Sequence, residues 1–266
     1  TNCGLIGKNA AVEVDGSAYW MSENGFFRYT GKLESLPCLV EDYVFDDINT
    51  IPRNHICAGL NNLFGEVTWF YPGSGAASNN RSVTYNYMDS TAERPVWTTS
   101  SLARTAWQDS AVFGKPHGTE YDADATSDST VGNTDGVTTY YEHETGVNQI
   151  KAGASSAIAA NIESGDFDIN QEGLGGDGDV IMKIRRILPD FLQQTGDATV
   201  TLNLKNYPTD SQASSSLGPF TSTTSTTKID TRARARAISL KVDNTSTTQH
   251  WKLGTFRLDI QPDGRR

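Results

Sequence analysis

One short segment, RARARA at residues 232–237, carries an arginine at every second position. Successive side chains of a β-strand point to opposite faces, so the pattern predicts a strand with guanidinium groups on one face and small alanines packed on the other. Guanidinium groups bind carboxylates and phosphates through paired hydrogen bonds. Three partners are open: carboxylates of a neighbouring subunit, phosphates of DNA, or water alone. We take Arg232, Arg234 and Arg236 as candidate inter-subunit contacts.

Three acidic residues, Glu163, Asp166 and Asp168, raise a second possibility. Two carboxylates on either side of a glycosidic bond can divide the roles of acid and nucleophile. Acidic residues that alternate along a strand edge are more often solvated or paired with a neighbouring subunit. The sequence has no nucleophile elbow, P-loop or dinucleotide-binding fingerprint. We therefore expect a protein that is not an enzyme and needs no cofactor, with a polysaccharide hydrolase as an alternative.

Residues that commonly bind metal ions are scattered. His143-Glu144 begins like the zinc motif H-E-x-x-H, but Val147 stands where the second histidine belongs. Asp122, Asp124 and Asp128 are spaced like the start of a calcium loop, yet that loop's glycine and its final glutamate are missing. The segment GGDGD at residues 175–179 is similar to a calcium-binding repeat but occurs once, whereas such sites need stacked repeats. We predict no metal site.

The elements that must position these residues are mostly strands. Asp15-Gly16 and Glu23-Asn24-Gly25 are hairpin turns between short strands at 11–14, 17–21 and 25–29. Further strands are predicted at 66–71, 82–87, 137–142, 179–187, 198–204, 232–242 and 255–260. The best helix candidate is Ile150–Glu163, although it is rich in Ala, Ser and Gly.

The fold class predicted is all-β. Aromatic-rich strand pairs recur in residues 1–178, which favours propeller-like antiparallel blades of about 40 to 50 residues each. A β-sandwich-like region with basic strands is predicted for residues 179–266. A meandering sandwich is the competing interpretation of the first region. The sequence contains no apolar run of 18 residues, so we expect no integral membrane contact.

Charge is distributed unevenly along the chain. Residues 1–179 hold 9 Lys and Arg against 25 Asp and Glu, whereas residues 180–266 hold 13 against 7. An acidic protein is a poor sequence-independent DNA binder, and an acidic surface suits equally a channel that DNA must pass without sticking and ordinary solubility. The three cysteines lack the spacing of a zinc site and are expected to be reduced thiols. The start at Thr1, without methionine, suggests a processed or partial polypeptide.

The last sixteen residues, WKLGTFRLDIQPDGRR at 251–266, resemble the C-terminus of a family of tail proteins of podoviruses, the short-tailed bacteriophages. The arginine-rich strand at 231–240, the segment YEHETG at 141–146 and the stretch AYWM at 18–21 are similar to segments of the same family. The likeness extends from about Asn9 to Arg266.

This resemblance implies a tail hub or nozzle protein of the kind described as packaged-DNA stabilisation proteins. It implies a propeller-containing homo-oligomer, expected to be a hexameric ring, which sits in the virion tail after assembly in the host cytoplasm. Such a ring would contact other tail or portal-adaptor proteins, close the exit channel and conduct double-stranded DNA non-specifically during ejection. The family has no catalytic residues to carry over.

An alternative of another class is a receptor- or glycan-binding tail appendage. Such a module is expected to expose Trp97 or Trp107 in a shallow site, whereas a ring component is expected to bury them.

Overall fold

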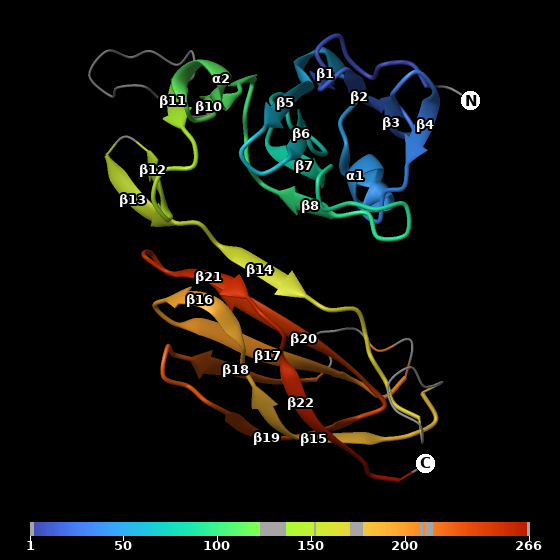
Figure 1. Cartoon of the computed structure of the whole chain (residues 1–266), viewed down its shortest axis with the longest axis vertical. Coiled ribbons are helices and arrows are strands. Elements are labelled where there is room, and N and C mark those ends of the chain that lie inside the picture. Colours follow the sequence, from blue (N-terminus) through green and yellow to red (C-terminus); the bar gives the residue numbers. More distant parts are fainter. Residues whose placement is uncertain are drawn as a thin grey trace. The chain divides into compact units, whose positions relative to one another are not determined.

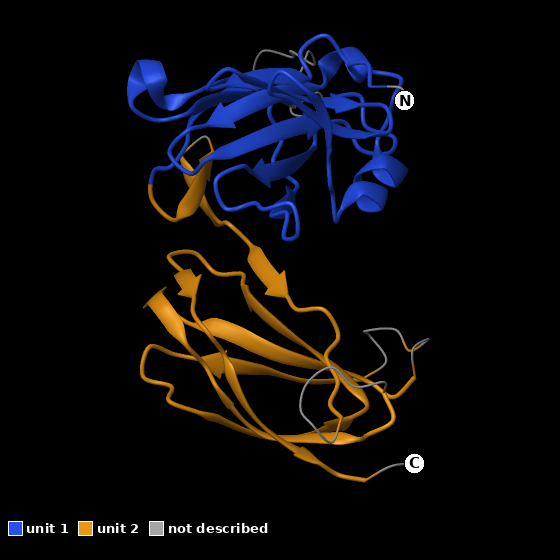
Figure 2. Ribbon diagram, turned by 45° about the vertical axis from the view of Figure 1, so that its right-hand side comes forward, with its two compact units in different colours: residues 1–145 blue, residues 146–266 orange. Residues whose placement is uncertain are grey.

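The computed structural model describes residues 3–122, 137–151, 153–170, 178–207, 210 and 215–264. The chain is all-β, with several antiparallel sheets (Figure 1). It divides into two compact units, residues 1–145 and 146–266, coloured separately in Figure 2. No helix in the described ranges is long and apolar enough to span a membrane.

The first sheet of unit 1 is a four-stranded meander in the order β1-β2-β3-β4. The turn between β1 and β2 is formed by Asp15 and Gly16, both with positive φ (49° and 79°), which is the backbone that a tight hairpin needs. The predicted strands of this region are confirmed. The bounds are β1 Ala11–Val14, β2 Ser17–Ser22, β3 Gly25–Tyr29 and β4 Leu33–Leu36.

The second sheet is also a four-stranded meander, in the order β5-β6-β7-β8. It shares one hydrophobic core with the first sheet, in which Phe26, Trp69 and Tyr71 are fully buried. The indole N–H of Trp69 donates to the carbonyl of Ala10 at 3.0 Å, so its burial leaves no polar group unpaired. The bounds are α1 Glu41–Asp47, a 3₁₀ turn Arg53–His55, β5 Cys57–Asn61, β6 Glu66–Tyr71, β7 Arg81–Asn86 and β8 Trp97–Ser100.

The third sheet of unit 1 has three strands in the order β11-β10-β9. Trp107 of β9 covers Gly59 of β5, where any Cβ would lie 2.5 Å from the indole Cγ. The Trp107 N–H donates to the carbonyl of Leu60 at 2.8 Å, so the absence of a side chain at Gly59 allows β9 to approach β5 closely. The bounds are β9 Ala106–Gln108, α2 Ser110–Phe113, β10 His117–Asp122 and β11 Val137–Glu142.

Unit 2 begins with strands where the sequence analysis suggested a helix at Ile150–Glu163, so that prediction was wrong. Gly153 has a φ of 80° and turns the chain between β12 and β13, which ends any helical backbone. β14 then pairs with β20 far along the chain. The bounds are β12 Asn148–Lys151, β13 Ala154–Ala157 and β14 Ala160–Glu163.

Two larger antiparallel sheets, β14-β20-β17-β18 and β19-β15-β22, contribute to a single core in unit 2. Val200, Leu202 and Ile238 enter it from the first sheet, and Met182 and Ile184 from the second. The bounds are β15 Met182–Leu188, β16 Phe191–Thr195, β17 Ala198–Lys205, β18 Ser216–Ser222, β19 Ile229–Ala235, β20 Ala237–Asn244, β21 His250–Leu253 and β22 Arg257–Pro262. The pair β16-β21 forms a small separate sheet.

The boundary between the two units, at residues 145 and 146, comes earlier in the chain than the predicted boundary between regions 1–178 and 179–266. Residues 160–170 belong to unit 2 because β14 extends its sheet and Phe167 exchanges backbone hydrogen bonds with Ile238. The predicted single strand at 232–242 is divided into β19 and β20, which lie in different sheets.

Candidate functional site

The predicted alternation is confirmed for residues 232–235 of β19 but ends there, because Arg236 lies beyond the strand and Ala237 begins β20. Ala233 and Ala235 are fully buried in the core of unit 2, whereas Arg232 and Arg234, which alternate with them, are exposed. The small alanines let β19 pack closely on the core, while both guanidinium groups remain in solvent on the outer face of the sheet.

The three arginines have different surroundings. The Nε of Arg234 lies 2.5 Å from Oδ2 of Asp263, and this contact lowers the pKa of the Asp263 carboxyl. Arg236 lies beyond the end of β19 and donates to the carbonyls of Gly178 and Asp179 at 2.8 and 3.1 Å. Two of the three predicted arginines therefore line the strand, and the third binds backbone at its end. The role of all three between subunits stays a prediction.

Neighbouring strands add cations that the sequence analysis did not single out. Lys183 of β15 is the cross-strand partner of Arg234, and Arg257 lies at the start of β22 opposite Leu188. Arg186 of β15 pairs with Asp230 at 3.2 Å. The available signal in MKIRRIL at 182–188 was incomplete: Met182, Ile184 and Ile187 are fully buried, but the alternation is interrupted by a register shift between Ile184 and Arg186. We call the outer surface of β19-β15-β22 with Lys183, Arg186, Arg232, Arg234 and Arg257 the basic face.

Positive charge on the basic face is only partly compensated. Asp230 forms an ion pair with Arg186, and Asp263 forms one with Arg234. Within the described part of the chain, no carboxylate lies within ion-pair distance of Arg232 or Arg257, both of which are exposed. Unpaired guanidinium groups close to other cations favour an anionic partner.

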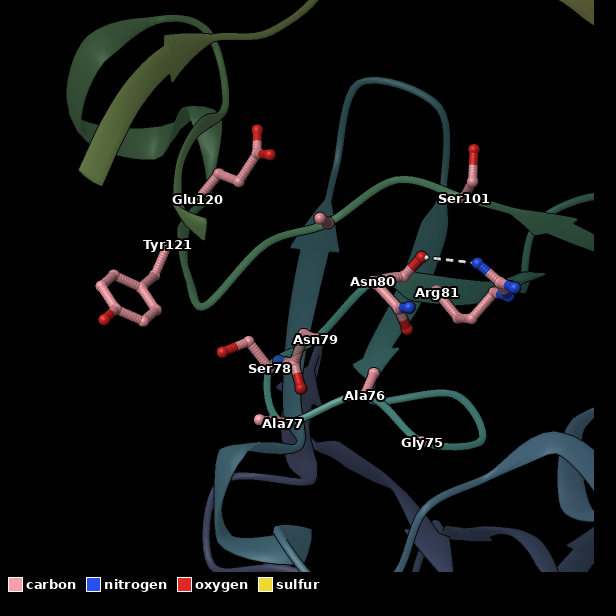
Figure 3. Close-up of a pocket in the computed structure, with 11 residues that line it drawn as sticks. Gly75, Ala76, Ala77, Ser78, Asn79, Asn80, Arg81, Ser101, Glu120 and Tyr121 are labelled. Atoms are coloured by element: carbon pink, nitrogen blue, oxygen red, sulfur yellow. Dashed lines mark hydrogen bonds between the residues drawn. The ribbon is translucent and has the colours of Figure 1, made fainter. Parts of the chain in front are cut away.

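Unit 1 has a pocket of about 530 Å³ beside the loop between β6 and β7 (Figure 3). Asn79 and Asn80 line it from the loop, Arg81 from the start of β7, and Glu120 and Tyr121 from β10. Both charged side chains are ion-paired, since Arg81 pairs with Asp47 at 3.3 Å and Glu120 with Arg104 at 3.6 Å. The lining of the pocket is therefore mainly polar.

Glu120 of this pocket pairs with a buried cation, Arg104. Arg104 is 4 % exposed, and its guanidinium lies 4.0 Å from the centroid of the Tyr141 ring. Its Nε donates to Nε2 of His143 at 2.9 Å, which requires that nitrogen to be unprotonated. Burial and the charge of Arg104 lower the pKa of His143 to about 4. His143 therefore accepts this hydrogen bond as a neutral, half-buried imidazole directly after β11.

The acidic residues considered for hydrolysis are held by neighbouring groups. Oε1 of Glu163 accepts hydrogen bonds from Asn203 and Ser239, both at 2.7 Å. Asp166 pairs with Lys205 at 2.5 Å, and Asp168 accepts from the backbone N–H of Gly178 at 2.9 Å. Each carboxylate thus joins segments of unit 2 to one another.

The other predicted sites are only partly covered by the described residues. Asp124 and Asp128 of the calcium-like loop and residues 175–177 of the GGDGD segment lie outside them. Within the described ranges, no group of three or more His, Cys, Asp or Glu side chains could hold a metal ion. The three cysteines are free, and burial raises the pKa of Cys38 and of Cys57 to about 11.

The tryptophans proposed as markers of a glycan site are both half-buried and pack against other rings of unit 1. The Trp97 ring lies 4.7 Å from Phe26 and 4.8 Å from Tyr85, and its N–H donates to the carbonyl of Pro37. Trp107 packs on Phe70 at 5.5 Å. Each ring is therefore neither fully buried, as expected for a ring component, nor fully exposed, as expected for a glycan site.

Comparison with known proteins finds no protein-family model that matches this chain and no curated protein with significant similarity.

Proposed function

We propose that this chain is a structural component of a bacteriophage tail, a hub or nozzle subunit that assembles with copies of itself around the DNA exit channel. The resemblance of the terminal segment at 251–266 supports this proposal. The fold is compatible with it, because two four-stranded antiparallel meanders that bury a common core are units from which propeller blades are built. The two sheets around the core of unit 2 fit a sandwich-like second region.

The observation that carries the proposal is the contrast between an acidic unit 1 and the basic face of unit 2. Unit 1 contains 8 Lys and Arg against 19 Asp and Glu, whereas unit 2 contains 14 against 13 and gathers five of its cations on the basic face. In a homo-oligomer, the basic face of one copy can meet the acidic surface of the next, and such complementary charges guide association and fix its register. The remaining acidic surface would repel the phosphates of DNA that passes through the assembly.

The structure refines which arginines should be tested. Arg236 binds the backbone of its own chain, so its removal would perturb folding as well as assembly. Arg232 and Arg257 are exposed and have no ionic partner within the described ranges, which makes them the informative pair.

The experiment is to measure the mass and symmetry of the purified protein by light scattering and electron microscopy. We expect a ring with a DNA-wide lumen, and we expect Arg232→Ala combined with Arg257→Ala to shift the mass towards the monomer. Arg94→Ala, which removes an exposed arginine of unit 1, is the matched control. A wild-type monomer or trimer would refute the ring, and an unchanged mass in the double variant would refute the bridging role of the basic face.

A further inference from the structure

A row of three aromatic rings lies along the third sheet of unit 1, with two rings exposed and the middle one half-buried. Phe113 is the last residue of α2, His117 is the first residue of β10 and Tyr140 lies on β11. The Phe113 and Tyr140 residues are each 62 % exposed. We call Phe113, His117 and Tyr140 the aromatic strip.

Strand alternation places the strip outside. Tyr141 is 8 % exposed and packs inward beneath Arg104, so its neighbour Tyr140 must point to the opposite face. Gly118 is likewise buried while His117 is turned outward. Only the inward side chains of this sheet pack in the interior of unit 1. Packing therefore does not require aromatic residues on the outer face.

The three rings touch one another in sequence. The His117 and Tyr140 rings are stacked, with centroids 5.2 Å apart and an angle of 21° between planes, and the Tyr140 hydroxyl lies 2.6 Å from Nδ1 of His117. Phe113 meets His117 edge-on at 4.8 Å. These contacts hold the side chains together and hence reduce the conformational entropy that a ligand would have to remove. Contiguous exposed apolar surface of this kind marks binding sites more often than scattered single residues do.

A polar group borders the strip. Glu142 is the cross-strand partner of His117, and its Oε1 lies 3.1 Å from Nζ of Lys115 and accepts from the hydroxyl of Thr145 at 2.8 Å. Lys115 also donates to Thr145 at 2.7 Å. These hydrogen bonds lower the pKa of the Glu142 carboxyl, so an ionised acceptor stands beside the rings near neutral pH.

From this geometry we infer that the aromatic strip is a binding platform for a neutral carbohydrate. One face of a pyranose ring presents C–H groups that pack on aromatic rings, and its hydroxyls seek carboxylate, ammonium and hydroxyl partners such as Glu142, Lys115 and Thr145. The inference is independent of the proposed tail function, since it concerns a different surface in a different unit.

Charge argues against a nucleic acid on the same rings. Binding to a phosphate backbone depends on cations that displace counterions. Lys115, the cation beside the strip, is already paired with Glu142, and unit 1 has 19 acidic residues against 8 basic ones. A contact between copies of the chain, with the rings at its centre and Lys115 and Glu142 at its polar rim, is the competing occupant that the oligomer mass below tests.

The test is affinity electrophoresis of the full chain through gels that contain dextran, mannan, galactomannan or a β-1,3-glucan, with heparin and double-stranded DNA as charged probes. At least one neutral polymer should retard the wild type, and Tyr140→Ala should weaken the apparent affinity for it by roughly tenfold, the loss expected when one stacked ring is removed. Tyr140→Phe keeps the ring and should retain most of the binding.

Tyr43→Ala is the matched control, because Tyr43 on α1 is 58 % exposed and lies outside the strip. Near-ultraviolet circular dichroism of each variant checks that the sheet remains folded. Retardation by the charged polymers alone, by no polymer, or equally in Tyr140→Ala and Tyr43→Ala would overturn the inference. A change in oligomer mass in Tyr140→Ala, without loss of carbohydrate binding, would overturn it in favour of a contact between copies.

Discussion

Mild acid should destabilise unit 1 through a single histidine. Nε2 of His143 accepts a hydrogen bond from Arg104 at 2.9 Å, and the imidazole packs 4.5 Å from the Trp107 ring. Burial, followed by the charges of Arg104 and His117, lowers the pKa of His143 from 6.5 to about 4. The folded state therefore keeps this ring neutral at pH values where the unfolded chain protonates it.

The sign and size of the effect follow from proton linkage. Between pH 6.5 and about 4 the unfolded state binds more protons than the folded state, so the free energy of unfolding falls as the pH is lowered through this window. Lowering the pH from about 7.5 to about 5 removes about 2 kcal/mol by this relation. Because the ring is only partly buried, solvent screening reduces the loss, and we expect about 1 to 2 kcal/mol.

The assay compares the wild type with His143→Gln, whose amide oxygen can accept from Arg104 but does not titrate. Urea unfolding would be followed by tryptophan fluorescence, which reports mainly on unit 1 because Trp20, Trp69, Trp97 and Trp107 lie there. The pH range stays above the sequence pI of about 4.8 to limit precipitation. The variant should lose less stability than the wild type on acidification.

A second variant and the opposite result make this prediction refutable. His250→Gln removes a histidine of unit 2 and should leave the pH dependence of the fluorescence transition unchanged. If the stability of the wild type and of His143→Gln fell in parallel between about pH 7.5 and about 5, the linkage argument would be refuted.

Two further substitutions test the packing of each unit. Gly59→Ala places a methyl group 2.5 Å from Cγ of Trp107 and should lower the free energy of unfolding by about 1 to 3 kcal/mol. Gly165→Ala, whose methyl group would have no atom within 4 Å, should change the free energy of unfolding little. The midpoints of urea unfolding check both variants. Glu163→Gln weakens the acceptor for Asn203 and Ser239 and should cost unit 2 about 1 to 2 kcal/mol in thermal unfolding. Unchanged stability in that variant, with loss of a polysaccharide-cleaving activity, would contradict a structural role for Glu163.

Local sequence patterns predicted a structural feature correctly where neighbouring residues alone determine it. The Asp15-Gly16 pair predicted its hairpin because both residues tolerate positive φ, and the spacing of Ala233 and Ala235 predicted the buried side of β19. The helix expected at 150–163 failed because the partner of β14 is β20, which is distant in the sequence. The same limitation applies to Lys183 and Arg257, which join the basic face only because β15 pairs with β19 and with β22.

Both proposed surfaces occupy positions that the core does not constrain. On β19 and on β11, the inward residues Ala233 and Tyr141 are buried, so volume and packing restrict what can stand there. The outward residues Arg232 and Tyr140 meet solvent and are free of that restriction. Substituting an outward residue should therefore change assembly or carbohydrate binding while stability stays nearly constant, and substituting an inward residue should do the reverse. This asymmetry distinguishes a lost interaction from a damaged fold in each of the experiments on the two surfaces.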